Sequence, residues 1–297
     1  MNFKASGKLL LFGEYFVLRG AKCFAMPLSY GQKLQITSLK KEETGIEWEA
    51  YGPNACWLKI LFTNTLEIQE ASDREIAQKV QKLLKYIKKK NPSLYIENLH
   101  FSFEINFDRQ FGFGTSSTFI SLLSQWAKTD PYELLANSFG GSGYDIAAAT
   151  ADKPFVYSKE KKIQNFCPLP DSITNYLLFV YLGNKQKTAT EIKKFEDKKI
   201  DKSQIEKINN LVFSATQCKD IIEWENLMET SEKTLAKILQ IDPVKKCHFS
   251  DYSFAIKSLG AWGGDFIMAS CRDLTAGKKY FEQKNKHPIY TYKELIK

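Results

Sequence analysis

The chain has 297 residues, of which 43% are hydrophobic and 26% are charged. This composition is typical of a soluble globular protein, and it excludes a disordered chain, a collagen-like chain and a small disulfide scaffold. The length predicts two domains of ordinary size. The longest apolar runs are far shorter than the roughly 20 residues of a membrane-spanning helix, so we expect no membrane segment. Gly13 and Glu14 interrupt the first apolar stretch, which argues against a signal peptide.

The net charge of +8 comes almost wholly from lysine, because only Arg19, Arg74, Arg109 and Arg272 are arginine. Arginine is the usual residue for reading base edges and for bidentate phosphate binding, so the charge does not predict a nucleic-acid partner. The six cysteines are scattered and form no C-x-x-C pair. This pattern indicates reduced thiols in a cytoplasmic protein rather than a zinc site.

The first half of the chain alternates predicted strands and helices. Strands are expected over residues 3–12 and 34–39. The first clear helix spans 73–90, with Ser72 and Glu75 as a capping box. Apolar residues alternate with polar ones from 101 to 107, which predicts a strand with one buried face, followed by a glycine loop and another helix.

The second half begins after a glycine cluster and a short alanine-rich stretch at 144–151. Residues 159–175 contain two prolines and are predicted to be the domain linker. The elements expected beyond it are a buried strand at 176–182, long helices from Ser203 with Glu206 in a second capping box, a helix at 252–259 and a strand at 265–270. Strands and helices mix without a regular βαβ rhythm, which favours an α+β fold over a Rossmann fold.

The segment from Gly112 to Ser117 predicts a site for an anion. Gly112 and Gly114 let the backbone approach a ligand closely, and the hydroxyls of Thr115, Ser116 and Ser117 stand where the next helix begins. The alternative is that the glycines only make a turn and that Thr115 or Ser116 is the N-cap. The segment is not a Walker A loop, since no lysine follows the second glycine.

Three other features carry candidate chemistry. Asp145 follows a glycine turn and opens a helix, so it either caps that helix or handles a substrate proton or a cation. A helix N-terminus makes an aspartate a weaker base, which favours orientation and charge management as its role. Lys8 lies in an otherwise apolar strand, where its ammonium group either reaches the surface or serves a site. The glycine segment at 260–264 is either a plain turn or a place of close approach.

In this order and at these separations, the segments resemble the motifs of the GHMP kinase superfamily. Residues 6–15 are similar to its opening motif, 112–118 to its phosphate loop and 260–264 to its last glycine loop. The resemblance extends from residue 5 to about residue 270. The phosphomevalonate kinase branch is the most similar, on residues 7–18 and 141–149.

The resemblance implies an α+β fold of two domains, 1–165 and 166–297, with the active site in the interdomain cleft and the phosphate loop at 109–118. It implies an ATP- and Mg²⁺-dependent kinase of the isoprenoid pathway whose acceptor is phosphomevalonate. Mevalonate kinase and a non-catalytic ligand-binding relative remain open alternatives. The partner expected is a small anionic substrate, with no nucleic acid and no membrane, and a homodimer remains open.

The resemblance also implies roles for individual residues. Lys8 and Asp145 would be catalytic, and Ser116 would contact Mg²⁺. The implied nucleotide contacts are Gly112, Gly114, Thr115, Ser116 and Ser117. The implied substrate contacts are Glu14, Tyr15, Ser142, Gly143, Tyr144, Lys187, Thr188, Gly260 and Gly263. The chain departs from the family pattern at Trp262, where glycine is usual, and at Leu134, where some mevalonate kinases have an acidic Mg²⁺ ligand.

Overall fold

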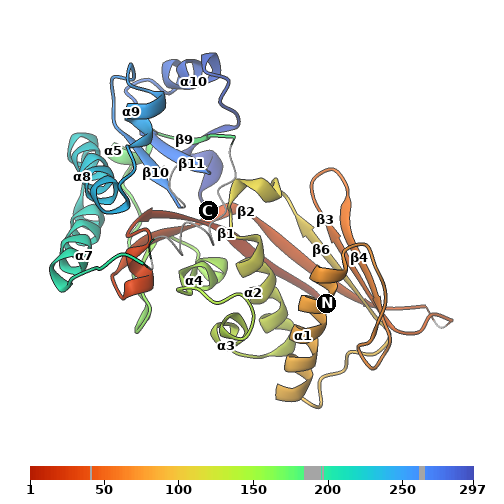
Figure 1. Ribbon diagram of the computed structural model, residues 1–297. Helices are drawn as coiled ribbons and strands as arrows, with labels where there is room; N and C mark the ends of the chain where they lie inside the picture. Colours follow the sequence, from red (N-terminus) through yellow and green to blue (C-terminus); the bar gives the residue numbers. More distant parts are fainter. Residues whose placement is uncertain (41, 184–194, 196, 261–264) are drawn as a thin grey trace. The chain divides into compact units, whose positions relative to one another are not determined.

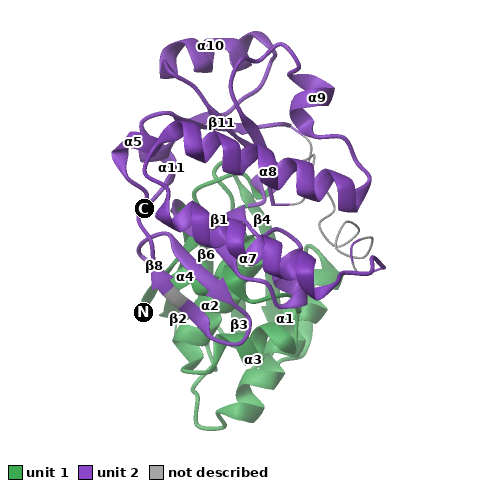
Figure 2. Cartoon of the chain, turned by 90° about the vertical axis from the view of Figure 1, so that its left-hand side faces the viewer, with its two compact units in different colours: residues 1–7, 30–109, 113–150 green, residues 8–29, 110–112, 151–297 purple. Residues whose placement is uncertain are grey.

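The computed structural model describes residues 1–297 except 41, 184–194, 196 and 261–264 (Figure 1). The chain forms two compact units (Figure 2). Unit 1 comprises residues 1–7, 30–109 and 113–150, and unit 2 comprises residues 8–29, 110–112 and 151–297. Strands β1 (Asn2–Phe12) and β2 (Cys23–Ser38) therefore each contribute residues to both units. The division into domains 1–165 and 166–297 stays a prediction.

Unit 1 is built on a β-sheet. Strand β3 (Ile46–Tyr51) pairs in parallel with β6 (Leu99–Ile105) and antiparallel with β4 (Cys56–Phe62). Strand β4 also pairs with β5 (Ile68–Ala71), and β6 pairs with residues 32–38 of β2. Every second residue of β3 and β6 is buried, as the sequence predicts for β6, so this sheet presents one face to the core.

Helices of unit 1 cover that buried face (Figure 1). They are α1 (Arg74–Lys90), α2 (Thr115–Ala127), α3 (Pro131–Ala136) and α4 (Tyr144–Thr150). Trp48 lies at the centre of the core, where its ring stacks on Phe101 and Phe103 at centroid distances of 5.0 and 4.7 Å. This packing fixes the strand that leads to the glycine loop at residue 112.

Unit 2 contains a second, antiparallel sheet in the order β10-β11-β9-β12. Its strands are β10 (Ile256–Leu259), β11 (Phe266–Ser270), β9 (Leu177–Tyr181) and β12 (Ile289–Thr291). All residues of β9, β10 and β11 are buried. Helix α8 (Ile221–Leu239) contacts β10, and α10 (Leu274–Gln283) contacts β9.

The other elements of unit 2 surround this sheet and the ends of β1 and β2. Residues 23–25 of β2 pair with β7 (Phe155–Ser158), which pairs with β8 (Lys162–Phe166). The remaining helices that lie wholly in unit 2 are η1 (Phe16–Arg19), α5 (Asp171–Thr174), α7 (Lys202–Gln217), α9 (Val244–His248) and α11 (Tyr292–Leu295). None of the described helices combines the length and the apolar character needed to cross a membrane.

The structure corrects two of the predicted elements. The helix predicted at 252–259 is wrong, because residues 256–259 form strand β10 and pair with β11. Its four residues are all buried, and a short buried strand has no periodicity that separates it from a helix. The linker predicted at 159–175 contains β8 and α5.

Both predicted capping boxes lie at the right helices but on the wrong residues. The N-cap of α1 is Asp73, whose carboxylate accepts from the amide of Ile76, while the hydroxyl of Ser72 accepts from the amide of Lys59. The N-cap of α7 is Asp201, which forms a capping box with Gln204. In both cases an aspartate takes the N-cap position.

Candidate active site

Close backbone approach fixes the turn that follows β1. Gly13 has φ 94°, and a Cβ atom there would lie 2.5 Å from the carbonyl oxygen of Lys22, so only glycine fits. Two residues further on, Tyr15 has φ 61° and ψ −45°, a region that residues with a side chain rarely adopt. Lys8 lies half-buried on the strand that leads into this turn. Lys8 and the turn both belong to unit 2.

Glu14, in the same turn, is 1% exposed, and its side chain is hydrogen-bonded to another residue of unit 2. The Nζ atom of Lys257, on β10, donates a hydrogen bond to Glu14 Oε1. Lys257 is not among the residues predicted from the sequence to serve a site, because residues 252–259 were expected to form a helix. The signal that was available is the one that marked Lys8, a single lysine in a short apolar segment.

The predicted phosphate loop leads directly into α2. Gly112 and Gly114 both have positive φ, 68° and 90°. The N-cap of α2 is Gly114, so neither Thr115 nor Ser116 caps the helix. Because glycine has no side chain to satisfy the first amides, the start of α2 is open to an anion.

The hydroxyls that follow this loop differ in their surroundings. Ser117 is buried and donates to the carbonyl oxygen of Gly114 at 2.8 Å, and buried Thr118 donates to Gln32 Oε1 at 2.7 Å. Ser116 is exposed on the first turn of α2. Ser116 is therefore the hydroxyl of the three that is placed to meet a ligand.

Gly112 of the loop also contacts a carboxylate that is not among the predicted site residues, Asp265. A Cβ atom on Gly112 would lie 2.4 Å from Oδ2 of Asp265, and both residues belong to unit 2. Asp265 is 9% exposed and stands directly before β11, where its carbonyl oxygen accepts from the amide of Leu182 at 2.9 Å. Its position after a glycine segment is the sequence signal that could have marked it.

Asp145 stands in the first turn of α4 and is half-buried. The glycines at 140, 141 and 143 all have positive φ and make the turn before it. Ser142 and Tyr144 are buried beside them. The alanines of α4 are buried against α2, and their small side chains let the two helices come close.

Three of the predicted substrate contacts, Lys187, Thr188 and Gly263, lie outside the described residues, as does Trp262. Gly260 is described and has φ 68°. Lys8 belongs to unit 2 and Asp145 to unit 1, so their joint action remains a proposal.

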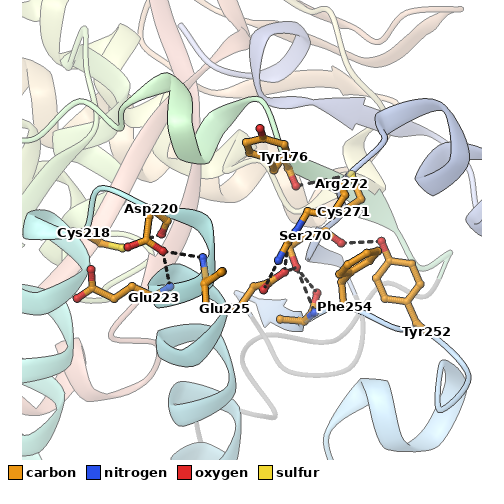
Figure 3. A network of polar contacts seen from close by, with 12 residues as sticks. Tyr176, Cys218, Asp220, Glu223, Glu225, Tyr252, Phe254, Ser270, Cys271 and Arg272 are labelled. Carbon is orange, nitrogen blue, oxygen red and sulfur yellow. Dashed lines mark hydrogen bonds and ion pairs between the residues drawn. The ribbon is translucent and has the colours of Figure 1, made fainter.

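A polar network joins α8 to β11 in another part of unit 2 (Figure 3). The guanidinium of Arg272 donates twice to Glu225, at 2.9 and 2.8 Å, and the hydroxyl of Ser270 donates to the same carboxylate at 2.5 Å. Arg272 also lines a cavity of about 270 Å³ beside Tyr252 and Phe254. Since Arg272 is already paired with Glu225, we assign this network to packing within unit 2.

The residues at the loop fit a metal that arrives with a nucleotide. Among the residues that the structure describes, no three His, Cys, Asp or Glu side chains gather into a metal site. Mg²⁺ usually keeps several waters and takes few protein ligands when phosphates supply others. The exposed hydroxyl of Ser116 beside an open helix N-terminus is suited to that arrangement.

No protein-family model matches the sequence, and no curated protein matches it. Solved structures do match across nearly the whole chain. Mevalonate kinase of Methanococcus jannaschii is 18% identical with a TM-score of 0.69, covering 98% of this chain and 96% of that one. Phosphomevalonate kinase of Streptococcus pneumoniae, solved with phosphomevalonate and AMPPNP, is 14% identical with a TM-score of 0.69, covering 98% and 99%. Galactokinase of Lactococcus lactis, solved with galactose, is 11% identical with a TM-score of 0.69, covering 97% and 91%.

The chain therefore has the α+β fold of the GHMP kinases, as the motifs predicted. These three kinases match the chain with the same TM-score, although they are named for different acceptors. The fold alone does not determine the substrate.

Proposed function

We propose that the chain is an ATP-dependent small-molecule kinase that phosphorylates phosphomevalonate. The observation that carries the proposal is the glycine loop that leaves the start of α2 open, in a chain with the GHMP kinase fold. Phosphoryl transfer depends mainly on positioning and on stabilising negative charge, and an open helix N-terminus and a lysine supply both.

The nucleotide contacts in this proposal are Gly112, Gly114, Thr115, Ser116 and Ser117. The backbone at the first three would approach the phosphates, and exposed Ser116 would contact Mg²⁺. Buried Ser117 would support the loop by donating a hydrogen bond to the carbonyl oxygen of Gly114. The chemistry that bound MgATP supplies is a γ-phosphoryl group whose charge is partly neutralised.

Lys8 and Asp145 are the proposed catalytic residues. The Lys8 ammonium group would stabilise negative charge on the phosphoryl group in transfer. Asp145 would orient the acceptor from the first turn of α4. The proposed acceptor contacts among the described residues are Tyr15, Ser142, Gly143, Tyr144 and Gly260, while Glu14, which is 1% exposed, would support them from the turn.

Phosphomevalonate is the proposed acceptor because a phosphate acceptor does not require Asp145 to act as a strong base. A phosphate monoester has a second pKa near 6, so it is already deprotonated at neutral pH and needs no strong base. An alcohol such as that of mevalonate keeps its proton and gains from a general base. The matches to mevalonate kinase keep mevalonate as the second candidate.

A coupled ADP-release assay tests the function directly. Purified chain with MgATP is supplied in turn with mevalonate, phosphomevalonate, diphosphomevalonate, homoserine and galactose, and Lys8→Met is the matched inactive control. We expect the highest kcat/KM with phosphomevalonate. Preference for mevalonate would move the assignment to the second candidate. Failure to bind MgATP, or to release ADP with any acceptor, would favour a non-catalytic ligand-binding relative.

A further inference from the structure

Unit 2 contains a fully buried lysine on strand β10. Lys257, on β10, is 0% exposed. Its Nζ donates to Glu14 Oε1 and, at 2.9 Å, to the carbonyl oxygen of Ser258, and it lies 5.3 Å from the ring centroid of Phe12. A buried ammonium group is tolerated only when charged and polar partners replace water, so these contacts are needed for Lys257 to be there.

Glu14 depends on this lysine in turn. Its Oε2 atom is buried and has no hydrogen-bond partner among the described residues, and Lys257 supplies the charged partner of Oε1. Burial raises the pKa of Glu14, and the charge of Lys257 opposes that rise. The ion pair joins the turn after β1 to β10, and these segments are more than 240 positions apart in the chain.

A second carboxylate closes the cluster from α8. Glu232 is 3% exposed, and its carboxylate accepts from the amide of Ser258 at 2.9 Å and from the hydroxyl of Ser258 at 3.3 Å. Burial, more than the nearby Glu14, raises the pKa of Glu232 to about 7, while Lys257 acts in the opposite direction. Glu232 thereby fixes the residue next to Lys257 and can carry a proton.

The residue that follows Glu14 is the strained one. Tyr15 has φ 61° and ψ −45°, and such a conformation persists only where the surroundings hold it. The amide of Phe16 donates to the Glu14 carbonyl at 2.6 Å, and the amide of Val17 donates to the Gly13 carbonyl at 3.2 Å. The backbone on one side of Tyr15 is therefore anchored through the Glu14 side chain to Lys257.

We propose that Lys257 is a positioning residue for the phosphotransfer, acting through Glu14 to hold Tyr15 in its strained conformation at the end of the Lys8 strand. This inference rests on the proposed function, in which Tyr15 contacts the acceptor. Lys257 itself is fully buried and acts through its partner. Glu14, being 1% exposed and bonded to Lys257, then serves the acceptor site by shaping the turn rather than by direct contact.

The test must separate positioning from stability. Removing one charge would leave the other buried and uncompensated, so the single variants are expected to fold poorly. The double variant Glu14→Gln with Lys257→Met removes both charges and keeps similar volumes. The matched control is Glu225→Gln with Arg272→Met, which removes an ion pair between α8 and β11 in the same unit.

The first readout is kinetic, measured well below the unfolding midpoint of each variant. We expect the Glu14/Lys257 variant to raise the acceptor KM about tenfold with a smaller change in the KM for ATP, because a displaced contact residue weakens acceptor placement. The Glu225/Arg272 variant should leave both constants near those of the wild type. An unchanged acceptor KM in the Glu14/Lys257 variant would overturn the proposal.

The second readout is amide hydrogen exchange at Phe16 and Val17, which needs no activity. We expect faster exchange in the Glu14/Lys257 variant than in the control at matched global stability. Unchanged exchange would show that the ion pair does not hold the turn, whatever the enzyme does. Absence of turnover by the wild type would instead contradict the kinase proposal, so the two failures are distinguishable.

Discussion

The carboxylate of Asp265 occupies the space that a side chain on Gly112 would need. A Cβ atom at Gly112 would lie 2.4 Å from Oδ2 and 2.8 Å from Cγ of Asp265. The first glycine of the proposed phosphate loop is thus required twice, by its positive φ of 68° and by the neighbour it faces.

Gly112→Ala should lower both the free energy of unfolding and ATP affinity. The strained φ alone costs on the order of 1–3 kcal/mol, and the clash with Asp265 adds to it by displacing the loop. Denaturant unfolding and nucleotide titration measure the two effects. Gly20→Ala is the matched control, since Gly20 has φ 91° but no atom within 4 Å of its Cβ position. Equal losses of ATP affinity in both variants would contradict this account of the loop.

Ser116→Ala and Ser117→Ala should separate metal binding from loop stability. Removing the exposed hydroxyl of Ser116 should raise the Mg²⁺ concentration needed for half-maximal ADP release about tenfold. Removing the hydroxyl of Ser117 breaks its bond to Gly114 and should cost about 1 kcal/mol of stability with a smaller Mg²⁺ effect. The same Mg²⁺ dependence in both variants would remove Ser116 from the metal site.

Lys8→Met should lower kcat by about 10²-fold or more, because it removes a charge that stabilises the transition state. Steady-state kinetics give kcat, and circular dichroism confirms that the variant is folded. Near-normal turnover of the folded variant would show that the half-buried lysine serves only the strand.

Asp145→Asn should lower kcat by a similar factor with an alcohol acceptor and with a phosphate acceptor, because the proposed role of Asp145 is to orient the acceptor and not to take its proton. The comparison uses mevalonate and phosphomevalonate on one preparation of the variant. A loss of about 10²–10⁴-fold that is confined to mevalonate would instead assign Asp145 to proton transfer.

Glu232→Gln should change how stability depends on pH. The folded pKa of Glu232 is about 7 against a usual value of 4.5, so the folded chain holds an extra proton between these values. The protonated carboxyl of Glu232 contributes about 3 kcal/mol to the free energy of unfolding below pH 4.5. This contribution is lost as the pH rises through 7. The charged groups that face it are Lys257 and Glu14. Denaturant unfolding from pH 5 to 8 should give a wild-type curve that falls relative to the variant's, and parallel curves would refute the assignment.

The sequence predicted the elements whose periodicity is local. The alternation from 101 to 107 and the apolar stripe of residues 73–90 gave β6 and α1 nearly in full. The glycines at 112 and 114 predicted a loop that leads into a helix, and the backbone there has positive φ at both glycines before α2 begins. These patterns follow from the geometry of one strand, one helix or one turn, so they can be recognised without knowledge of distant residues.

What the sequence could not supply depends on pairing between distant segments. Strand β10 was predicted as helix because only its pairing with β11 makes it a strand. Lys257 and Asp265 could not be recognised as site residues from the sequence, because their neighbours are far away in the chain. Lys257 contacts Glu14, and Asp265 lies beside Gly112. Long-range contacts of this kind leave no periodic signal, although a lone charge in an apolar segment is a sign that they exist.

The shared course of β1 and β2 affects the order in which the chain is able to fold. Each unit contains residues from the first 38 positions. In unit 2, residues 8–29 pack with residues from the C-terminal half of the chain. The hydroxyl of Ser29 donates to the carbonyl oxygen of Ile296 at 2.9 Å, and Leu28 forms a β-bridge with the same residue. Leu28 and Ser29 therefore cannot make these contacts until Ile296 has been synthesised. Contacts of such high sequence separation slow folding, and they make unit 2 a poor candidate for expression as a contiguous fragment.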